Sequence, residues 1–355
     1  MTELFVIAEA GVNHNGDPAL ALELVDVAAE SGADAVKFQT FRAEALVTTS
    51  TPMAEYQQRN LGHKLSQHEM LRELELHRET HFLLQERAEA RGILFLSTPF
   101  DVQSLDFLVR ELRMSTIKVP SGEITNHPFL LAVARQAEHV ILSTGASTMP
   151  EVSAAVATLS FGFNFETGTP PSEHADRELD AVTRKRLTIL HAVTAYPAPS
   201  AESNLRVIPA LRAEFDCRVG LSDHSLGSHV SMAAVALGAQ VIEKHFTLDR
   251  SLPGPDHAAS LTPTELSSFV NQLRETSRAL GDGVKRVQPS ETKNQLLVRR
   301  SLIAIREISP GETFDESNVA ALRPGTQRSP ADWWKIMGAT ASKRYHIGET
   351  IDEAL

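Results

Sequence analysis

The sequence predicts an α/β protein, a (β/α)8 barrel followed by a small second domain. Three observations predict it: eight short apolar runs before residue 250, helical patterns between most of them, and a different pattern after Gly283. Several of the runs are almost continuously apolar, which is typical of parallel strands that are covered on both faces. Eight strands that alternate with helices favour the barrel, and an open doubly wound sheet is the alternative.

Each apolar run ends in small or polar residues. The eight predicted strands are Leu4–Ala8, Ala35–Phe38, Ile93–Leu96, Thr116–Val119, Val140–Leu142, Leu187–Leu190, Val219–Leu221 and Val241–Glu243. After the first strand, Asp17 and Pro18 mark the start of a helix, and Gly32 marks its end. The same alternation of strand and helix returns near Pro128, Pro150, His229 and Pro263.

Two long stretches interrupt this alternation. Residues 41–78 follow the second strand and are rich in Gln, Asn, His and Glu, so we expect them to build a substrate-binding loop. Residues 162–185 contain Gly, two consecutive prolines and mixed charges, which predicts an exposed, mobile loop.

The last barrel helix is predicted at Glu265–Leu280, and a Gly-Asp-Gly sequence ends it. We therefore expect a barrel domain at 1–282, a linker at 283–298 and a small domain at 299–355. Within the small domain, the sequence Gly-Glu-Thr-x-Asp-Glu occurs twice, at 311–316 and 348–353. This repeat predicts a compact, partly β domain made of two similar halves.

Composition excludes several classes of protein. The 355 residues contain 34 Lys and Arg against 45 Asp and Glu, a net charge of −11, which argues against nonspecific binding to nucleic acid or to anionic membranes. Cys217 is the single cysteine, which excludes an intrachain disulfide and a cysteine zinc cluster. There is no apolar run of ~18 residues and no signal-like start, so we expect a cytoplasmic enzyme.

Polar side chains follow every predicted strand. They are Glu9, Asn13, His14, Lys37, Gln39, Ser97, Thr98, Lys118, Ser121, Glu123, Ser143, Thr144, His191, Thr194, Tyr196, Ser222, Asp223, His224, Glu243, Lys244 and His245. Barrel enzymes carry their active sites at the carboxyl ends of the strands, so this set predicts an active site. The alternative is that these residues are only turn residues and helix caps.

Two lysines among these residues point to an anion. Lys37 and Lys118 supply charge, and the hydroxyls of Thr98, Ser121, Ser143 and Ser222 supply directed hydrogen bonds, which together suit a phosphate. A lone serine at such a place is typically a cap, but a charged lysine in a barrel mouth is costly unless it is paired.

Two histidines and three carboxylates complete the predicted site. His224 and His245 follow neighbouring strands and, with oxygen ligands, would suit Mn²⁺, Co²⁺, Zn²⁺ or Fe²⁺, against a structural, hydrogen-bonded role. Glu9, Glu123 and Asp256 could move protons or bind sugar hydroxyls. Pairing with a lysine is the alternative for Glu9, and a turn is the alternative for Asp256. No Walker loop, dinucleotide fingerprint or Gly-x-Ser-x-Gly elbow occurs.

Taken together, these motifs resemble the sialic acid synthase family, which joins phosphoenolpyruvate to an N-acetylhexosamine. The motifs that carry the resemblance are Ala8–His14, Val36–Thr40, Ser97–Phe100, Lys118–Glu123, Leu142–Gly145, Gly220–His224, Glu243–Thr247, Pro253–His257 and Leu322–Gly325. The resemblance covers almost the whole chain. It implies a (β/α)8 barrel followed by an antifreeze-like (SAF) domain.

The resemblance also implies roles for particular residues. Catalytic roles fall on Glu9, Lys37 and Glu123, and a divalent metal, usually Mn²⁺, on His224 and His245. Phosphoenolpyruvate would be bound by Thr98, Lys118, Ser121, Ser143, Thr194 and Ser222. The sugar would be bound by Gln39, Asn60, Tyr196, Asp256 and Arg323. Thr194 is a departure, because the family has an asparagine there. In the family's domain-swapped homodimer, the small domain caps the partner's barrel.

The activity implied is N-acetylneuraminate synthesis, a metal-dependent condensation of phosphoenolpyruvate with open-chain N-acetylmannosamine that releases phosphate by C–O cleavage. The alternative within the family is a legionaminate synthase that uses a 2,4-diacetamido-trideoxyhexose, an acceptor that lacks the 6-hydroxyl. The alternative from another class is a non-catalytic saccharide-binding protein, which would leave both strand-end lysines and both histidines without a task.

Overall fold

The structure is a computed structural model and describes residues 4–54, 57–58, 66–170 and 179–352. The chain forms two compact units, Met1–Asp282 and Gly283–Leu355. Within the described ranges, no helix is both long enough and apolar enough to cross a membrane.

The first unit is built on one sheet of eight parallel strands. They are β1 (Phe5–Gly11), β2 (Ala35–Thr40), β3 (Leu94–Pro99), β4 (Thr116–Val119), β5 (His139–Ser143), β6 (Leu187–Ala192), β7 (Arg218–Asp223) and β8 (Val241–His245). The sheet order is β3-β2-β1-β8-β7-β6-β5-β4, so β1 pairs with both β2 and β8. The edge strands β3 and β4 come round to pack against each other, without a hydrogen-bonded ladder between their described residues. This confirms the predicted barrel, open at one seam, over the doubly wound sheet.

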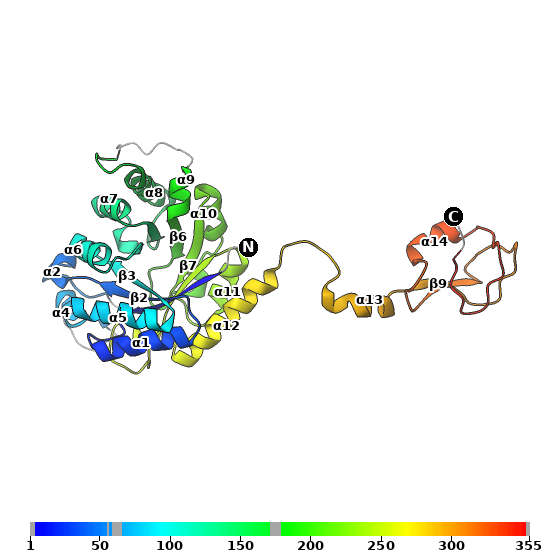
Figure 1. The fold of residues 1–355 in the computed structure, drawn as a ribbon, viewed down its shortest axis with the longest axis horizontal. Coiled ribbons are helices and arrows are strands. Elements are labelled where there is room, and N and C mark those ends of the chain that lie inside the picture. The colour runs from blue at the N-terminus through cyan, green and yellow to red at the C-terminus, as the bar shows by residue number, and fades with distance from the viewer. Residues whose placement is uncertain (1–3, 55–56, 59–65, 171–178, 353–355) are drawn as a thin grey trace. The chain divides into compact units, whose positions relative to one another are not determined.

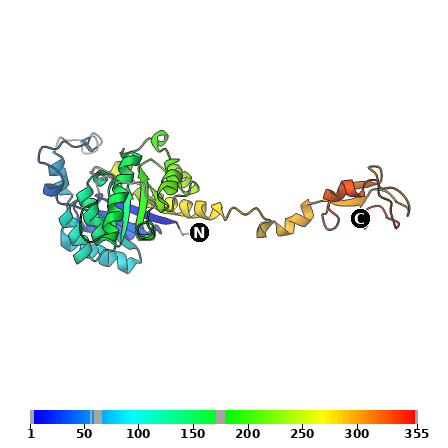
Figure 2. The same ribbon diagram turned by 90° about the horizontal axis from the view of Figure 1, so that it is seen from above.

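Helices surround the strands (Figures 1 and 2). They are α1 (Pro18–Glu30), α2 (Ala43–Leu46), α4 (Gln67–Glu73), α5 (Arg78–Arg91), α6 (Val102–Asp106), η1 (Phe107–Glu111), η2 (Ser121–Glu123), α7 (His127–Gln136), α8 (Met149–Asn164), α9 (Ala181–Arg186), η3 (Ser200–Glu202), α10 (Val207–Phe215), α11 (His229–Ala236), η4 (His257–Ala259) and α12 (Pro263–Leu280). The main apolar core lies between these helices and the outer face of the sheet.

The first helix begins and ends where its sequence predicts. The Asp17 side chain accepts a hydrogen bond from the Ala19 backbone N–H at 2.7 Å, and Pro18 is the first helical residue. Gly32 follows the last turn with φ +77°, a left-handed conformation that glycine adopts without strain.

Most strands extend further toward their carboxyl ends than the apolar runs predict. Strand β2 continues through Thr40, β7 through Asp223 and β8 through His245. The polar residues of these ends therefore lie on the strands, where pairing with neighbouring strands fixes the direction of their side chains.

The two predicted insertions contain helices. Residues 41–78 include α2 and α4, and part of this stretch lies outside the described residues. The prediction of a loop at 162–185 is wrong at both ends, because α8 runs through Asn164 and α9 begins at Ala181. Asp180 starts α9 by accepting hydrogen bonds from the Val182 and Thr183 backbone N–H groups.

The second unit has its own core around an antiparallel pair of strands. Its elements are η5 (Pro289–Glu291), α13 (Thr292–Val298), β9 (Ser301–Ala304), β10 (Val319–Leu322), η6 (Pro330–Asp332) and α14 (Trp333–Ile336). The stretch predicted as a linker thus contains a helix. The repeated motif forms the same turn twice: Glu312 accepts from the Ser309 N–H at 3.0 Å, and Glu349 accepts from the His346 N–H at 2.9 Å.

Candidate active site

The interior of the barrel is layered. Alternate residues of a strand point to the same side, so residues two apart along each strand lie one above the other inside the barrel. The lower layer is an apolar cluster of Ile7, Ala35, Leu96, Ile141, Leu190 and Val241. Two residues further along their strands stand Glu9, Lys37, Thr98, Ser143 and Glu243. Polar groups therefore lie on an apolar floor at the carboxyl end of the barrel.

A cavity of about 360 Å³ opens above this floor, and nearly all the predicted site residues line it. Those that do are Glu9, Lys37, Gln39, Thr98, Lys118, Ser121, Glu123, Ser143, Thr194, Tyr196, Ser222, His224, His245 and Asp256. Asn60 lies outside the described residues. Arg323 belongs to the second unit, where its Nε donates to the Val298 carbonyl at 3.0 Å.

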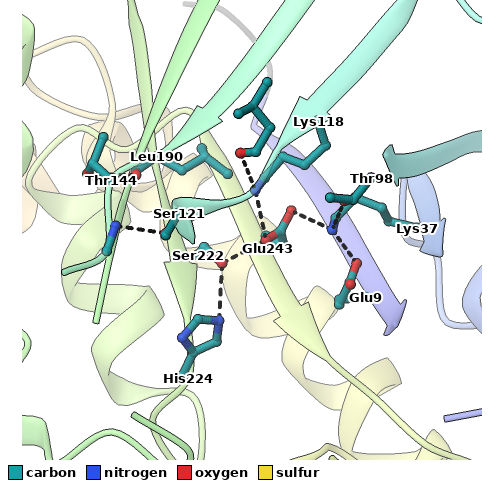
Figure 3. Close-up of polar contacts among 12 residues, drawn as sticks. Glu9, Lys37, Thr98, Lys118, Ser121, Thr144, Leu190, Ser222, His224 and Glu243 are labelled. Carbon is teal, nitrogen blue, oxygen red and sulfur yellow. Dashed lines mark hydrogen bonds and ion pairs between the residues drawn. The ribbon is translucent and has the colours of Figure 1, made fainter. Parts of the chain in front are cut away.

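Two lysines and two glutamates form a buried cluster, called here the charged layer: Glu9, Lys37, Lys118 and Glu243 (Figure 3). Lys37 Nζ lies 2.7 Å from Glu9 Oε2 and 3.6 Å from Glu243 Oε2, and it donates to Thr98 Oγ1 at 3.0 Å. Lys118 Nζ lies 3.9 Å from Glu243 Oε1. Two positive and two negative groups neutralise one another, which makes their burial tolerable.

The pKa values in the charged layer are moved by burial and by the partners. Burial alone would raise the pKa of Glu243, but Lys118, Lys37 and a hydrogen bond from Ser222 outweigh it and hold that pKa at about 2. Burial lowers the pKa of Lys118 to about 8, against the attraction of Glu243. Burial raises the pKa of Glu9 to about 7, although Lys37 opposes the rise. The layer can therefore exchange protons near neutral pH.

Several hydroxyl groups line the same cavity as Lys118. Ser121 Oγ accepts from the Gly145 backbone N–H at 2.8 Å. A Cβ at Gly145 would lie 2.3 Å from Thr194 Oγ1 and 2.9 Å from Ser121 Oγ, so only glycine leaves this space open. Ser143 Oγ is buried and hydrogen-bonds no described residue. Hydroxyls and a lysine around an open space suit an anion with several oxygens.

Two imidazoles and a phenol ring lie together at the ends of β6, β7 and β8. The ring centroids of His224 and His245 are 5.7 Å apart, and the Tyr196 ring lies against His224 with centroids 4.1 Å apart and a tilt of 33° between the rings. Burial lowers the pKa of His224 and lowers the pKa of His245 well below its usual range. Both rings are therefore neutral at pH 7, as metal ligands must be.

The hydrogen bonds of His224 leave one nitrogen available. Its Nδ1 donates to the Val193 carbonyl at 2.7 Å, which places the lone pair on Nε2. Ser222 Oγ lies 3.4 Å from that Nε2, but the hydroxyl donates its proton to Glu243 at 2.7 Å. His245 Nδ1 is buried and hydrogen-bonds no described residue. The unpartnered Nδ1 of His245 and the lone pair on Nε2 of His224 fit a divalent metal.

The protein supplies only part of a coordination sphere. Within the described ranges, no group of three or more His, Cys, Asp or Glu is arranged to hold a metal. A metal on His224 and His245 would complete its sphere with substrate and water oxygens, as in sites that keep positions open for catalysis.

Outside the barrel wall, a second buried ion pair supports the two histidines. Lys244 Nζ lies 2.9 Å from Asp223 Oδ2, and both side chains are 2% exposed. Asp223 also accepts from the hydroxyls of Ser225 and Ser231. Because Asp223 precedes His224 and Lys244 precedes His245, this pair holds the ends of β7 and β8 together.

The sequence motifs alone do not indicate roles for Glu243, Gly145, Asp223 and Lys244. The alternation along β8 could have identified three of them, because Glu243 and His245 must share the inner face while Lys244 faces outward toward Asp223. Glu9 does pair with a lysine, Lys37, which was the alternative to a proton-transfer role for this carboxylate.

The remaining predicted residues lie at the rim or beside the charged layer. Glu123 accepts a hydrogen bond from Asn126 Nδ2 at 2.6 Å. Asp256 precedes η4, and burial raises the pKa of its carboxyl to about 6. Gln39 lies near the end of β2 and close to Gly11. A Cβ atom added at Gly11 would lie 3.5 Å from Gln39 Nε2.

Curated relatives match nearly the whole chain. The N,N'-diacetyllegionaminic acid synthase of Campylobacter jejuni is 43% identical over 99% of this chain and 100% of its own. The enzyme of the same name from Legionella pneumophila is 44% identical over 98% of this chain and 93% of its own. The crystal structure of a sialic acid synthetase from Leptospira borgpetersenii has a TM-score of 0.67 and 32% identity, over 82% of this chain and 90% of that one.

Family models match both units. The NeuB family matches residues 24–285, and the SAF domain matches residues 299–354. These matches and the full-length relatives agree with the layered barrel and its cavity, and they bear out the resemblance to the sialic acid synthases. The chain belongs to the NeuB family and carries a SAF domain at its C-terminal end.

Proposed function

We propose that this protein, a transferase of the nonulosonic acid synthase type, condenses phosphoenolpyruvate with a 2,4-diacetamido-trideoxyhexose to give N,N'-diacetyllegionaminate. The observation that carries the choice of sugar is the identity of 43% and 44% to two synthases of that name, against 32% to a sialic acid synthetase. The sequence motifs alone favour N-acetylmannosamine as the acceptor, whereas the relatives favour the 2,4-diacetamido sugar. N-acetylneuraminate synthesis remains the second candidate.

The proposed phosphoenolpyruvate site lies over the barrel strands. Lys118 supplies charge, and the hydroxyls of Ser121, Ser143, Thr194 and Ser222 supply hydrogen bonds around the open space at Gly145. Phosphate groups are bound by this combination of a cation and several short donors. Lys118 also belongs to the charged layer, where Glu243 lies 3.9 Å from its Nζ, so the added anion relies on the hydroxyl donors as well.

His224 and His245 would hold the divalent metal, which we take to be Mn²⁺. The metal would supply Lewis acidity for the sugar aldehyde. Tyr196 would hold the His224 ring by contact between the two rings, and the Val193 carbonyl would fix the proton of that ring on Nδ1.

The proposed reaction joins C3 of phosphoenolpyruvate to the aldehyde carbon of the open-chain sugar. Water then adds to C2, and phosphate leaves with its bridging oxygen by C–O cleavage. Lys37 and Glu9 would move a proton at the new alcohol, and Glu123 at the rim would take a proton from the water. Glu243, whose pKa is low, would stabilise the positive charge that develops at C2. Holding the two reactants in line would contribute several kcal/mol, roughly.

On the sugar side, Gln39, Tyr196 and Asp256 line the cavity and would contact the acceptor. We extend the proposal to a cytoplasmic, domain-swapped homodimer in which Arg323 contacts the N-acyl group of the sugar on the partner. Replacing Arg323 by Ala should then raise the KM for the sugar and leave the KM for phosphoenolpyruvate unchanged.

Phosphate release from phosphoenolpyruvate tests the proposal. We expect release that requires Mn²⁺ and the 2,4-diacetamido-trideoxyhexose and that EDTA abolishes. Replacing His245 by Ala should abolish this turnover while the protein stays folded by circular dichroism. His346→Ala is the matched control, since that histidine is exposed on the second unit and should leave the rate unchanged. Phosphate release with N-acetylmannosamine but not with the 2,4-diacetamido sugar would favour the second candidate. Mn²⁺-dependent activity in His245→Ala would refute the assignment of His245 as a metal ligand.

A further inference from the structure

One side of the cavity is apolar, and it is built by the excursion between β2 and α5 together with the residue after β3. We call it the apolar wall. It consists of Leu46, Val47, Met70, Leu71, Leu74 and Phe100. These side chains pack with Met53 and Phe41 in a cluster separate from the main core. The wall is therefore a packed surface that can bury a ligand group.

The same stretch of chain is rich in charge, yet none of that charge lines the cavity within the described residues. Among the described residues between 41 and 78, those that line the cavity are members of the apolar wall and Gln57 and Gln67. Charged neighbours are engaged elsewhere: Arg42 donates to Gln103, and Glu69 accepts from Ser66 in a helix cap. Helix α4 thus turns its apolar face toward the cavity.

The charged layer, the hydroxyls and both histidines belong to the strand ends, so the apolar wall borders the part of the cavity left for the sugar. The two candidate sugars differ at C4, where one has an acetamido group and the other a hydroxyl, and at C6, where one has a methyl group and the other a hydroxymethyl group. A hydroxyl against apolar side chains loses its hydrogen bonds to water, whereas a methyl group gains from burial.

We propose that the apolar wall selects an acceptor sugar that is deoxygenated at C6, and that Leu46 and Val47 contact its methyl group. These two residues are half-buried, unlike Met70, Leu71 and Leu74, so they offer more accessible surface than the other members of the apolar wall in the excursion. The inference deepens the proposed function and rests on its reaction, but it concerns a single position of the substrate.

A pair of sugars that differ only at C6 isolates the effect. We compare kcat/KM for 2-acetamido-2,6-dideoxymannose with that for N-acetylmannosamine, at saturating phosphoenolpyruvate and Mn²⁺. An apolar pocket discriminates against an added hydroxyl by at most about 100-fold, so we expect a preference of about 10- to 100-fold for the deoxy sugar.

Variants of the wall should reduce this preference. Val47→Thr keeps the shape and adds a hydroxyl, and Leu46→Asn replaces an apolar group by an amide of similar size. Each should lower the preference about 5- to 10-fold, because each offers the 6-hydroxyl a partner. Val102→Thr is the matched control, since Val102 is exposed on α6 and does not line the cavity. The ratio of two sugars on one protein is insensitive to a loss of folded enzyme.

The outcomes separate the inference from the proposed function. No preference for the deoxy sugar, or a preference that neither variant changes, would overturn the wall assignment even if the 2,4-diacetamido sugar is turned over. A wall-dependent preference without turnover of the 2,4-diacetamido sugar would support the assignment and refute the proposed acceptor. No phosphate release with any sugar would refute both.

Discussion

The polar and apolar sides of the cavity are built by different kinds of chain segment. Strand ends supply the charged layer and the histidines, whose positions follow from the pairing of β1, β2, β7 and β8 and, for Lys118, from the pairing of β4 with β5. The apolar wall comes from short helices in an excursion that packs on itself. The side chains proposed to carry out the reaction therefore lie on the rigid strands of the barrel. The residues proposed to select the sugar lie on a segment that can change in sequence independently of the strands.

The largest effect should come from breaking the neutrality of the charged layer. Replacing Lys37 by Met leaves two buried carboxylates opposite one lysine, and losing one partner of a buried ion pair costs about 3–5 kcal/mol of unfolding free energy. The pKa of Glu9 is already about 7, and removing Lys37 raises it further above its value in the unfolded chain. The stability lost by the variant should therefore grow as pH rises from 6 to 8.

Urea unfolding of the metal-free protein at both pH values measures this loss. The control is the double variant Glu9→Gln/Lys37→Met, which restores neutrality and should recover most of the stability. A single variant as stable as the wild type at pH 8 would contradict the buried cluster.

The next effect contrasts two carboxylates of the same cavity. Glu243 has partners that hold its pKa at about 2, whereas burial without a charged partner raises the pKa of Asp256 from 3.8 to about 6. An acid whose pKa is raised by folding costs stability above its unfolded pKa, about 1.4 kcal/mol for each pKa unit. Asp256→Asn should therefore stabilise the protein by about 2–3 kcal/mol at pH 8.

That gain should vanish as pH falls toward 4, where Asp256 is protonated in the native state. Glu243→Gln should have the opposite sign and lower the stability at pH 8. Unfolding curves of both variants across this pH range give the measurement, and equal signs would contradict the contrast. A loss of activity in Asp256→Asn would show that the buried carboxylate is kept for the substrate.

The strand-borne side of the site could be predicted because β structure has a fixed period. Apolar runs located the strands, and the residue two positions beyond each inner apolar residue had to face the cavity, as Glu9 and Lys37 do. The barrel and both histidines follow from that pattern. An apolar run ends at the first polar residue, however, whereas the strand itself can continue. The apolar runs therefore do not predict that β2 and β8 extend over polar residues.

The apolar wall could not be predicted in the same way. Leu46, Met70 and Leu74 are scattered among charged residues, and only the packing of α2 against α4 shows which of them face the cavity. Gly145 was missed for a similar reason, since its importance lies in the space between Thr194 and Ser121, which are remote in sequence. Loop-borne sites depend on tertiary contacts that no local period encodes.

The smallest expected effect distinguishes a hydroxyl that only binds the substrate from a hydroxyl that also stabilises the free protein. Ser143 Oγ is buried and hydrogen-bonds no described residue, whereas Ser222 Oγ donates to Glu243 at 2.7 Å. Ser143→Ala should leave the unfolding free energy within about 0.5 kcal/mol of the wild type, because no hydrogen bond is lost. It should raise the KM for phosphoenolpyruvate about 10-fold, the equivalent of one hydrogen bond to a charged group. Ser222→Ala should raise this KM as well and should also destabilise the free protein by about 1–2 kcal/mol, since Glu243 loses a donor.

Thermal unfolding and steady-state kinetics of the two variants provide the measurement. A Ser143→Ala variant that is destabilised with an unchanged KM would make Ser143 a structural residue and move the anion away from β5.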